Sequence, residues 1–473
     1  MIHWQKLREF KSHMNHADLI TTKAQLIDYF QKGCKLQAQW RVGLEFEKFV
    51  YQSDHLKRAT FKGHQGIETL LKGLTRYGWL PVFEQSYLIA LYRKGSTVTL
   101  EPGGQIELSS SKHTNVHQLE KELLQFERET QEVGTQLKLD FLAMGYDPKS
   151  RLQDIPWMPK QRYSIMRSYM LKKGNLGHNM MQATAAIQVA LDYSSEADMA
   201  KKLRVALALQ PMLTGLLSNS PFKEGKVNGF QSYRSHIWKH TDPDRCGLLS
   251  FAFKENMSFE SYVDYALGVP MYFIKQGDDY LDVSGHPFQL YLDGKLPGHE
   301  GKQPTLQDWQ DHLTTLFPEI RLKQFLEMRG VDGGDPSQAL GLAAFWRGIL
   351  YDSCNLQAVY ERVKDWSYEE VREFLEEVAR SGLNARLQGT SLLDLGKEVI
   401  DLAEQGLKYQ RIHGQDDRIY LDPLKEIIDS GKTPAQRAIE TFVSCDKDID
   451  QTIRTLIRPK VSAICLNDIS SKK

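Results

Sequence analysis

The stretch that most constrains the fold is residues 97–109, TVTLEPGGQIELS, in which two alternating runs flank a Pro-Gly-Gly sequence. Alternation of apolar and polar residues is typical of β-strands with one buried face, so the stretch predicts an antiparallel hairpin. A turn of odd length places the apolar positions on one face: Val98, Leu100, Ile106 and Leu108. Glu101 and Glu107 then become direct cross-strand neighbours on the other face. Because like charges opposite each other are destabilising, we expect a positive group beside them.

Residues 42–49, VGLEFEKF, repeat this alternation upstream. Glu45 and Glu47 are two residues apart, so both side chains point to the same face of a strand. If the two stretches share a sheet, four carboxylates converge on one polar face, and oxygen ligands of this kind suit Mg²⁺. The alternative is that each pair forms only the solvated face of a half-exposed strand.

The composition indicates an ordinary globular protein. The chain has 473 residues, with 60 basic and 60 acidic side chains and a pI of about 7.2. A duplex-binding protein normally carries a basic excess, so nucleic acid is not an expected partner. The sequence shows neither an internal repeat nor a low-complexity linker. We therefore expect a single domain over residues 1–473, with a helical C-terminal cover at 355–445 as part of it.

The cysteines and the N-terminus indicate the compartment. Five cysteines lie far apart without a CxxC pair, which is typical of a reduced intracellular protein: Cys34, Cys246, Cys354, Cys445 and Cys465. Residues 1–16 lack the apolar core of a signal peptide. The longest apolar stretch, which starts at Val205, is too short to span a bilayer. We therefore expect a soluble, cytoplasmic protein that does not associate with membranes.

Capping residues and periodicity predict most of the helices. Four pairs have the spacing of a capping box: Thr22 with Gln25, Ser195 with Asp198, Ser367 with Glu370, and Ser391 with Asp394. An apolar face predicts another helix over 116–138, and the helix from Ser195 is expected to bend at Pro211. Residues 183–193 predict a strand, and aromatic strands with turns are expected beyond Phe259.

Residues 139–170 hold prolines, aromatics and three arginines, Arg151, Arg162 and Arg167. We interpret the segment as irregular. Loops dense in arginine and aromatic residues are common where anionic ligands bind, although a surface loop with stacked arginines has the same composition.

Residues 228–247, NGFQSYRSHIWKHTDPDRCG, form the most unusual segment. We expect Arg234 and Trp238 to face a ligand. His236 and His240 have the i,i+4 spacing of a zinc pair, but no Glu follows His236, so we favour ordinary hydrogen-bonded roles over a zinc site.

Missing motifs constrain the chemistry further. There is no GxxxxGK[ST] sequence, no GxGxxG after a strand and no GxSxG elbow. A nucleotide would therefore be held chiefly by metal ions and arginines, which fits phosphoryl transfer from ATP without a P-loop.

Together these stretches resemble the glutamate–cysteine ligases of the plant and proteobacterial type. The resemblance is carried by GLEFEKF, TLEPGGQIELSS, PKQRYSIMRSYM, LDYSSEADMAKKLRVALALQP, NSPFKEGKVNGFQSYRSHIW, DPDRCG, LKQFLEMRG and LDPLKEIIDSGKTPAQ. It implies a glutamine synthetase-like α+β fold, in which a curved antiparallel sheet forms a bowl with helices packed outside. It also implies ligation of the γ-carboxyl of L-glutamate to the amine of L-cysteine, with ATP and Mg²⁺, through γ-glutamyl phosphate. The product, γ-glutamylcysteine, is that of the first step of glutathione biosynthesis.

The resemblance also implies roles for individual residues. The implied magnesium ligands are Glu45, Glu47, Glu101 and Glu107, with Gln188 and Glu327 as further members of the cage. The implied anion-binding residues are Arg167, Arg234 and Arg329, for the glutamate carboxylates and the transferred phosphoryl oxygens, and Trp238 is expected to wall the amino-acid pocket. Arg234 and Arg329 are the implied catalytic residues, and no general base is named.

The chain departs from the family pattern at Ala190, where an Asn is usual in the strand QVNLD. This departure leaves open a ligase that uses the same acyl-phosphate chemistry with a different amine. A guanidino phosphotransferase on the related fold and a decayed ligase that only binds partners are further alternatives. We expect a monomer or a homodimer.

Overall fold

Strand β1 (Val42–Gln52) lies at the centre of a large antiparallel sheet. The computed structural model describes residues 19–277, 279–410 and 414–457. The strand order is β15-β16-β8-β1-β6-β5-β4-β3, and the outer end of β1 also pairs with β2 and β7. These strands are β2 (Lys57–Arg58), β3 (Leu80–Glu84), β4 (Tyr87–Arg93), β5 (Ser96–Leu100), β6 (Ile106–Ser109), β7 (Leu139–Leu142), β8 (Ala186–Leu191), β15 (Ile320–Leu322) and β16 (Leu326–Asp332). Residues 1–16 and Cys465, on which the compartment was argued, lie outside the described residues.

The two faces of the sheet differ as the alternation predicts. One face is buried against helices α4 (Val116–Leu137), α7 (Glu196–Leu216) and α12 (Pro336–Leu350). Apolar side chains of the strands fill this interface, among them Leu44, Phe46, Val98, Leu100, Ile106, Leu108 and Val189. The other face carries the polar positions, so the sheet presents them to a separate space.

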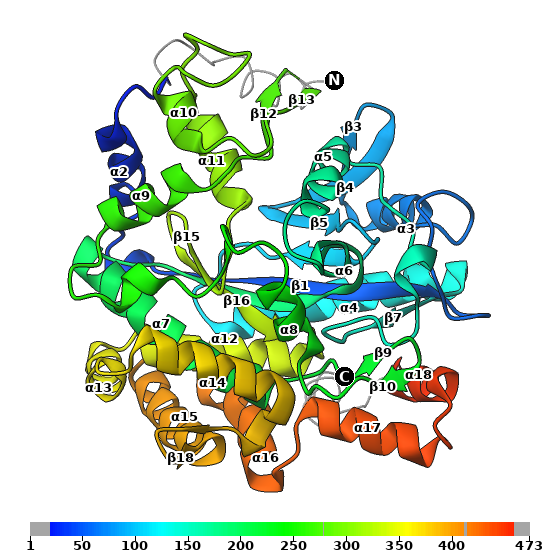
Figure 1. The fold of residues 1–473 in the computed structure, drawn as a ribbon. Coiled ribbons are helices and arrows are strands. Elements are labelled where there is room, and N and C mark those ends of the chain that lie inside the picture. Colours follow the sequence, from blue (N-terminus) through cyan, green and yellow to red (C-terminus); the bar gives the residue numbers. More distant parts are fainter. Residues whose placement is uncertain (1–18, 278, 411–413, 458–473) are drawn as a thin grey trace.

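The C-terminal helices form a further layer on α7 and α12. They are α13 (Ser353–Val363), α14 (Tyr368–Ser381), α15 (Leu392–Tyr409) and α16 (Asp422–Ser430), whereas α17 (Pro434–Ser444) packs beside β7 and the outer end of β1. In Figure 1 they lie below the sheet in yellow and orange. Most of the expected cover at 355–445 therefore reaches the sheet through α7 and α12. The single domain stays a prediction, supported by a main hydrophobic core that includes residues from α2 (Lys23–Gln31) to α16.

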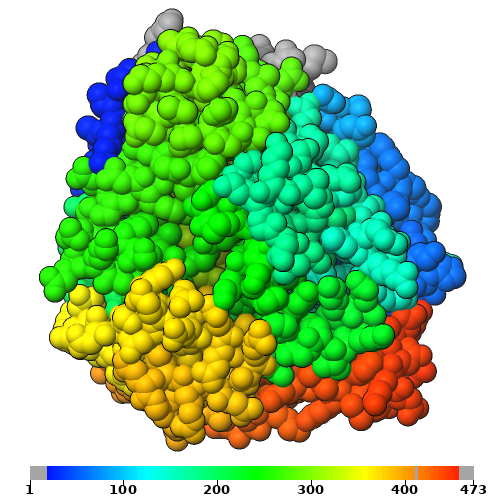
Figure 2. Space-filling view, viewed as in Figure 1, coloured from blue at the N-terminus to red at the C-terminus, as the bar shows by residue number. Residues whose placement is uncertain are grey.

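Helices also surround the polar side of the sheet. Figure 1 shows α5 (Gln161–Met170), α10 (Phe288–Leu292) and α11 (Leu306–Thr314) above it. The remaining helices of this group are α6 (Gly177–Ala183), α8 (Tyr233–Lys239) and α9 (Phe259–Gly268). In the space-filling view, the green segment with α9–α11 and the teal segment with α5 face each other across the middle of the molecule (Figure 2).

The structure confirms most predicted helix starts. Capping boxes occur at Thr22 before α2 (Lys23–Gln31) and at Ser367 before α14, and Ser195 and Ser391 cap α7 and α15. The last helix among the described residues is α18 (Ile449–Ile457), and the short α3 spans Ile67–Leu74.

Two expectations about elements were wrong. Residues 161–170 form α5 rather than an irregular segment, and helices α9–α11 interrupt the region beyond Phe259 where strands were expected. That region has one aromatic hairpin, β12 (Phe273–Gln276) with β13 (Asp279–Asp282). Across the described ranges, no helix is long and apolar enough to cross a membrane.

Candidate active site

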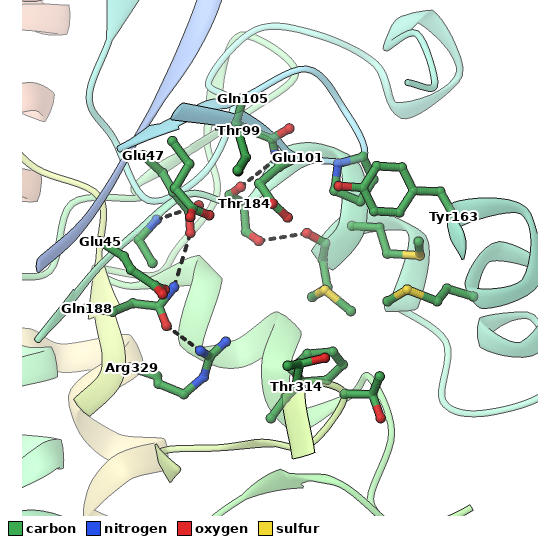
Figure 3. Close-up of a pocket in the computed structure, with 18 of the residues that line it drawn as sticks. Glu45, Glu47, Thr99, Glu101, Gln105, Tyr163, Thr184, Gln188, Thr314 and Arg329 are labelled. Carbon is green, nitrogen blue, oxygen red and sulfur yellow. Dashed lines mark hydrogen bonds between the residues drawn. The ribbon is translucent and has the colours of Figure 1, made fainter. Parts of the chain in front are cut away.

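The polar face of the sheet forms the floor of a pocket of about 250 Å³. The four glutamates singled out by the alternation all line it: Glu45, Glu47, Glu101 and Glu107. Figure 3 shows Glu45 and Glu47 on their strand, with Gln188 and with Glu101, which directly follows β5, near them. The convergence of both carboxylate pairs is therefore confirmed, and the alternative of two solvated strand faces is excluded.

The register differs from the prediction in one respect. Glu107 lies opposite Thr99, and the backbone N of Glu101 donates to the carbonyl of Gln105 (2.9 Å). Glu101 and Glu107 therefore share a face as diagonal neighbours, so the prediction of direct cross-strand neighbours is wrong. The residue directly opposite Glu107 on its other side is Glu47 of β1. The like-charge pair thus forms between the two stretches rather than within the hairpin.

The Pro-Gly-Gly turn is fixed by its surroundings. Gly104 has a φ of +80°, which an L side chain rarely adopts. A Cβ on Gly103 would lie 2.1 Å from the carbonyl O of Gln182, so only glycine fits there. The Gly103 carbonyl accepts a hydrogen bond from Arg58 (2.7 Å), which is buried in an ion pair with Asp147 (2.9 Å). The turn therefore holds Glu101 toward the pocket.

The carboxylates repel one another in this pocket. Burial and then the charges of Glu327 and Glu107 raise the pKa of Glu45 to about 7. Burial, Glu107 and Glu101 raise the pKa of Glu47 well above its ordinary value, and burial and Glu101 raise that of Glu107. Negative charge is thus concentrated on the strand face of the pocket, where a bound cation would stabilise it.

Two cations beside the hairpin are the positive groups that were expected there. Lys160 and Arg162, at the start of α5, line the pocket next to Glu101 and Glu107. Burial and the adjacent Arg162 lower the pKa of Lys160 to about 8. Sequence reasoning listed Arg162 only as part of an irregular segment and missed Lys160 altogether.

Arg234 and Trp238 lie one turn apart on α8 and both line the pocket, and their contact with a ligand stays a prediction. A terminal nitrogen of Arg234 donates to the carbonyl of Arg329 (2.9 Å), and its Nε is buried without a hydrogen-bond partner among the described residues. The rings of His236 and His240 contact each other in a tilted arrangement, with their centroids 4.4 Å apart. Within the described ranges, no three His, Cys, Asp or Glu side chains are grouped so as to hold a metal ion, so the zinc alternative gains no support.

Gln188 links the glutamates to the arginines. Its side-chain oxygen accepts from Arg329, and its nitrogen donates to Glu47 (3.3 Å), as the dashed lines in Figure 3 show. Arg329 also donates to Glu327 (2.7 Å). Arg329 therefore enters the pocket in a fixed orientation.

Two expected residues are not brought to the pocket. Glu327 is nearly fully buried among Arg321, Lys323 and Arg329, and these cations lower its pKa although burial would raise it. Arg167 is exposed and lies over the ring of Trp157 at 4.6 Å. Glu327 thus pairs with cationic side chains, and on α5 it is Arg162 rather than Arg167 that lines the pocket.

The charge repulsion predicts a stability effect. In metal-free solution at pH 8, Glu47→Gln should raise the free energy of unfolding by roughly 1 kcal/mol or more, because it removes a carboxylate whose folded-state pKa is raised. A carboxyl group whose pKa is raised on folding stabilises the folded state fully below its unfolded pKa of about 4.5, and this stabilisation is lost as the pH rises. The difference in stability between the variant and the wild type should therefore shrink toward pH 4.5. Thermal unfolding in a chelator at both pH values checks this. A variant that is less stable than wild type at pH 8 would show that repulsion among the carboxylates does not destabilise the folded protein.

Three comparisons with known proteins place the chain. The family model described as glutamate-cysteine ligase family 2 matches residues 41–464. The chloroplastic glutamate–cysteine ligase of Medicago truncatula is 44% identical over 422 residues, which cover 89% of this chain and 82% of the relative. Glutamate–cysteine ligase B, also chloroplastic, of Oryza sativa subsp. japonica is 42% identical over 438 residues, or 92% and 87% of the two chains.

Among solved structures, the glutamate–cysteine ligase of Francisella tularensis in complex with AMP aligns with a TM-score of 0.54 at 14% identity. The alignment covers 90% of each chain. At this identity the match shows the fold alone, and it confirms the α+β class with a large antiparallel sheet.

Proposed function

Since the chain belongs to the glutamate–cysteine ligase family 2, we propose that it joins the γ-carboxyl of L-glutamate to the amine of L-cysteine with ATP. The γ-carboxylate of glutamate displaces ADP from ATP to form γ-glutamyl phosphate. The amine of cysteine then displaces phosphate and loses a proton to give γ-glutamylcysteine, the product of the first step of glutathione synthesis. The observation that carries this proposal is the single pocket in which four glutamates face buried cations. Such a pocket suits phosphoryl transfer, which depends on charge stabilisation and positioning.

Magnesium fits the donor set of this pocket. Mg²⁺ binds through one or two carboxylates, with waters and substrate phosphates as the other ligands, so three preformed protein ligands are not required. We propose Glu45, Glu47, Glu101 and Glu107 as the residues that hold it, with Gln188 beside them. When bound, the ion neutralises phosphate charge during transfer. Glu327, bonded to three cations, serves instead to orient Arg329.

The cations of the pocket bind the anionic groups of the substrates. Arg234 and Arg329 lie next to the carboxylates of the floor, where a guanidinium can donate two parallel hydrogen bonds to a carboxylate or a phosphoryl group. Arg162 and Lys160 approach from α5 on the side of the hairpin. Together they hold the γ-carboxyl of glutamate in line with the transferred phosphoryl group, and this positioning lowers the barrier without a general base.

Retention of all four glutamates in one pocket argues against a decayed ligase that only binds partners. Ligation of a different amine and phosphorylation of a guanidino group use similar phosphoryl chemistry, so they remain as outcomes of the experiment. We also propose that the protein is a cytoplasmic monomer or homodimer. Size-exclusion chromatography with light scattering measures its oligomeric state.

The proposal is tested by ADP release from ATP, Mg²⁺ and glutamate, measured with and without cysteine. We expect release that depends on cysteine, with γ-glutamylcysteine identified by mass spectrometry. Release that ignores cysteine but responds to another amine would replace the acceptor. No release by folded protein with any amine would overturn the proposal.

A further inference from the structure

Helix α8 carries two residues of the pocket, Arg234 and Trp238, although it is only seven residues long. A helix of this length gains little stability from its own hydrogen bonds, so contacts with the rest of the protein must fix its position. Figure 1 shows α8 in green beside β16, with which it is in contact. The groups that bind its first turn to β16 therefore decide where Arg234 enters the pocket.

One such group is Asp332, the last residue of β16, whose two carboxylate oxygens both accept hydrogen bonds. Its Oδ1 accepts from the hydroxyl of Ser232 (2.7 Å). Its Oδ2 accepts from the hydroxyl of Ser220 (2.6 Å) and from the backbone N of Asn219 (2.8 Å). Asp332 is only 1% exposed, so water cannot replace these partners.

The two serines connect this carboxylate to α8. The hydroxyl oxygen of Ser232 accepts from the backbone N of Ser235 (3.2 Å), and that of Ser220 accepts from the backbone N of Arg234 (3.1 Å). Because an ionised carboxylate only accepts, each hydroxyl must point its single hydrogen at Asp332, which leaves its lone pairs for α8. The carboxylate thus orients both hydroxyls.

The surroundings of Asp332 are equally constrained. A Cβ on Gly145 would lie 2.4 Å from the carboxyl carbon of Asp332, too close for any side chain. Burial lowers the pKa of Arg234, and Asp332 is foremost among the negative charges that oppose this shift. The carbonyl of Arg329, also on β16, accepts from the guanidinium of Arg234 (2.9 Å). Strand β16 therefore holds Arg234 near its backbone and at its guanidinium.

We propose that Asp332 is a positioning residue: through Ser220 and Ser232 it fixes the first turn of α8 and so places Arg234 for a carboxylate of glutamate. This inference rests on the proposed function and adds a residue that sets its glutamate site. Asp332 lies outside the set of residues that line the pocket, so it acts through α8 rather than by contact with substrate.

The test is the KM for glutamate compared with the KM for ATP in serine variants. Ser220→Ala removes the link between Asp332 and the backbone N of Arg234, and it should raise the KM for glutamate about fivefold or more, because a small misplacement of a binding group is costly. The KM for ATP should stay within about twofold of wild type. Ser232→Ala breaks the second link and should act in the same direction. Asp332→Asn removes the charge and should exceed either, while the serine variants decide if it does not fold.

Two serines provide matched controls. Ser218→Ala removes an equally buried hydroxyl, which donates to the carbonyl of Gly215 (3.0 Å) and is not bonded to Asp332. Ser258→Ala removes the cap of α9, which accepts from the backbone N of Ser261 at the same 3.2 Å as the cap of α8. Both changes should lower the unfolding temperature but leave the KM for glutamate within about twofold of wild type.

The two proposals fail differently. If wild-type protein forms no γ-glutamylcysteine, the proposed function fails. If it forms the product but folded Ser220→Ala and Ser232→Ala keep the wild-type KM for glutamate, Asp332 does not position Arg234. If Ser218→Ala raises that KM as much, or if the KM for ATP rises equally in the test variants, a general loss of stability explains the effect and the positioning role is overturned.

Discussion

Glu101→Gln is expected to lower kcat by on the order of a hundredfold or more while the protein stays folded. The substitution keeps the size of the side chain and removes the charge that faces the pocket. No hydrogen bond of the Glu101 side chain to other described residues holds the turn together, since Gly103 is bound through its carbonyl and Gln105 through its amide. The loss should therefore be in the chemical step and in magnesium dependence rather than in folding.

The measurement is steady-state ADP release at increasing Mg²⁺, with circular dichroism to confirm the fold. Part of the lost activity should return at high Mg²⁺, because a weakened site fills by mass action. Glu373→Gln is the control, since Glu373 is an exposed residue of α14 outside the pocket and should behave as wild type. Turnover like that of wild type in Glu101→Gln would remove Glu101 from the magnesium site.

The floor of the site could be predicted because a strand repeats every two residues. Alternation placed Glu45 and Glu47 on the polar face of one stretch, and Glu101 and Glu107 on the polar face of the other. Pairing of the two stretches in one sheet was then enough to bring the four residues together. The exact register could not be predicted, because the three-residue turn pairs Thr99 with Glu107 through backbone hydrogen bonds that the sequence pattern does not specify. The shared face of Glu101 and Glu107 was therefore predicted correctly, but their direct pairing across the hairpin was not.

The walls of the site were harder to predict, since they come from short helices. Flanking prolines made residues 139–170 look irregular, although Tyr163, Met166 and Met170 have the spacing of a helical face and are buried in α5. That spacing was the available signal. It places Arg162 four residues before Met166 on the pocket side and Arg167 toward solvent.

Capping signals would have found two of the helices missed beyond Phe259. Ser258 accepts from the backbone N of Ser261 at the start of α9, and Thr305 forms a capping box with Asp308 at the start of α11. Which of these helices approaches the pocket depends on packing between segments far apart in the chain. No local pattern carries that information.

Arg234→Lys is expected to raise the KM for glutamate about tenfold or more and to lower kcat, with a smaller effect on the KM for ATP. A lysine keeps the positive charge but cannot donate two parallel hydrogen bonds to a carboxylate, and it also loses the bond to the carbonyl of Arg329. Because Arg234 is almost fully buried, the shorter reach of the ammonium cannot be corrected by movement of the chain.

Arg167→Lys is the matched comparison, since it makes the same change on an exposed arginine of α5 that the structure does not bring to the pocket. If the geometry decides the roles, Arg167→Lys should leave the KM for glutamate within about twofold of wild type, as is usual for surface substitutions. An equal rise in both variants would return Arg167 to the glutamate site and require α5 to turn. An unchanged KM and kcat in Arg234→Lys would exclude Arg234 as a glutamate ligand, and the carboxylates of the substrate would then depend on Arg162, Arg321 and Arg329, the other arginines that line the pocket.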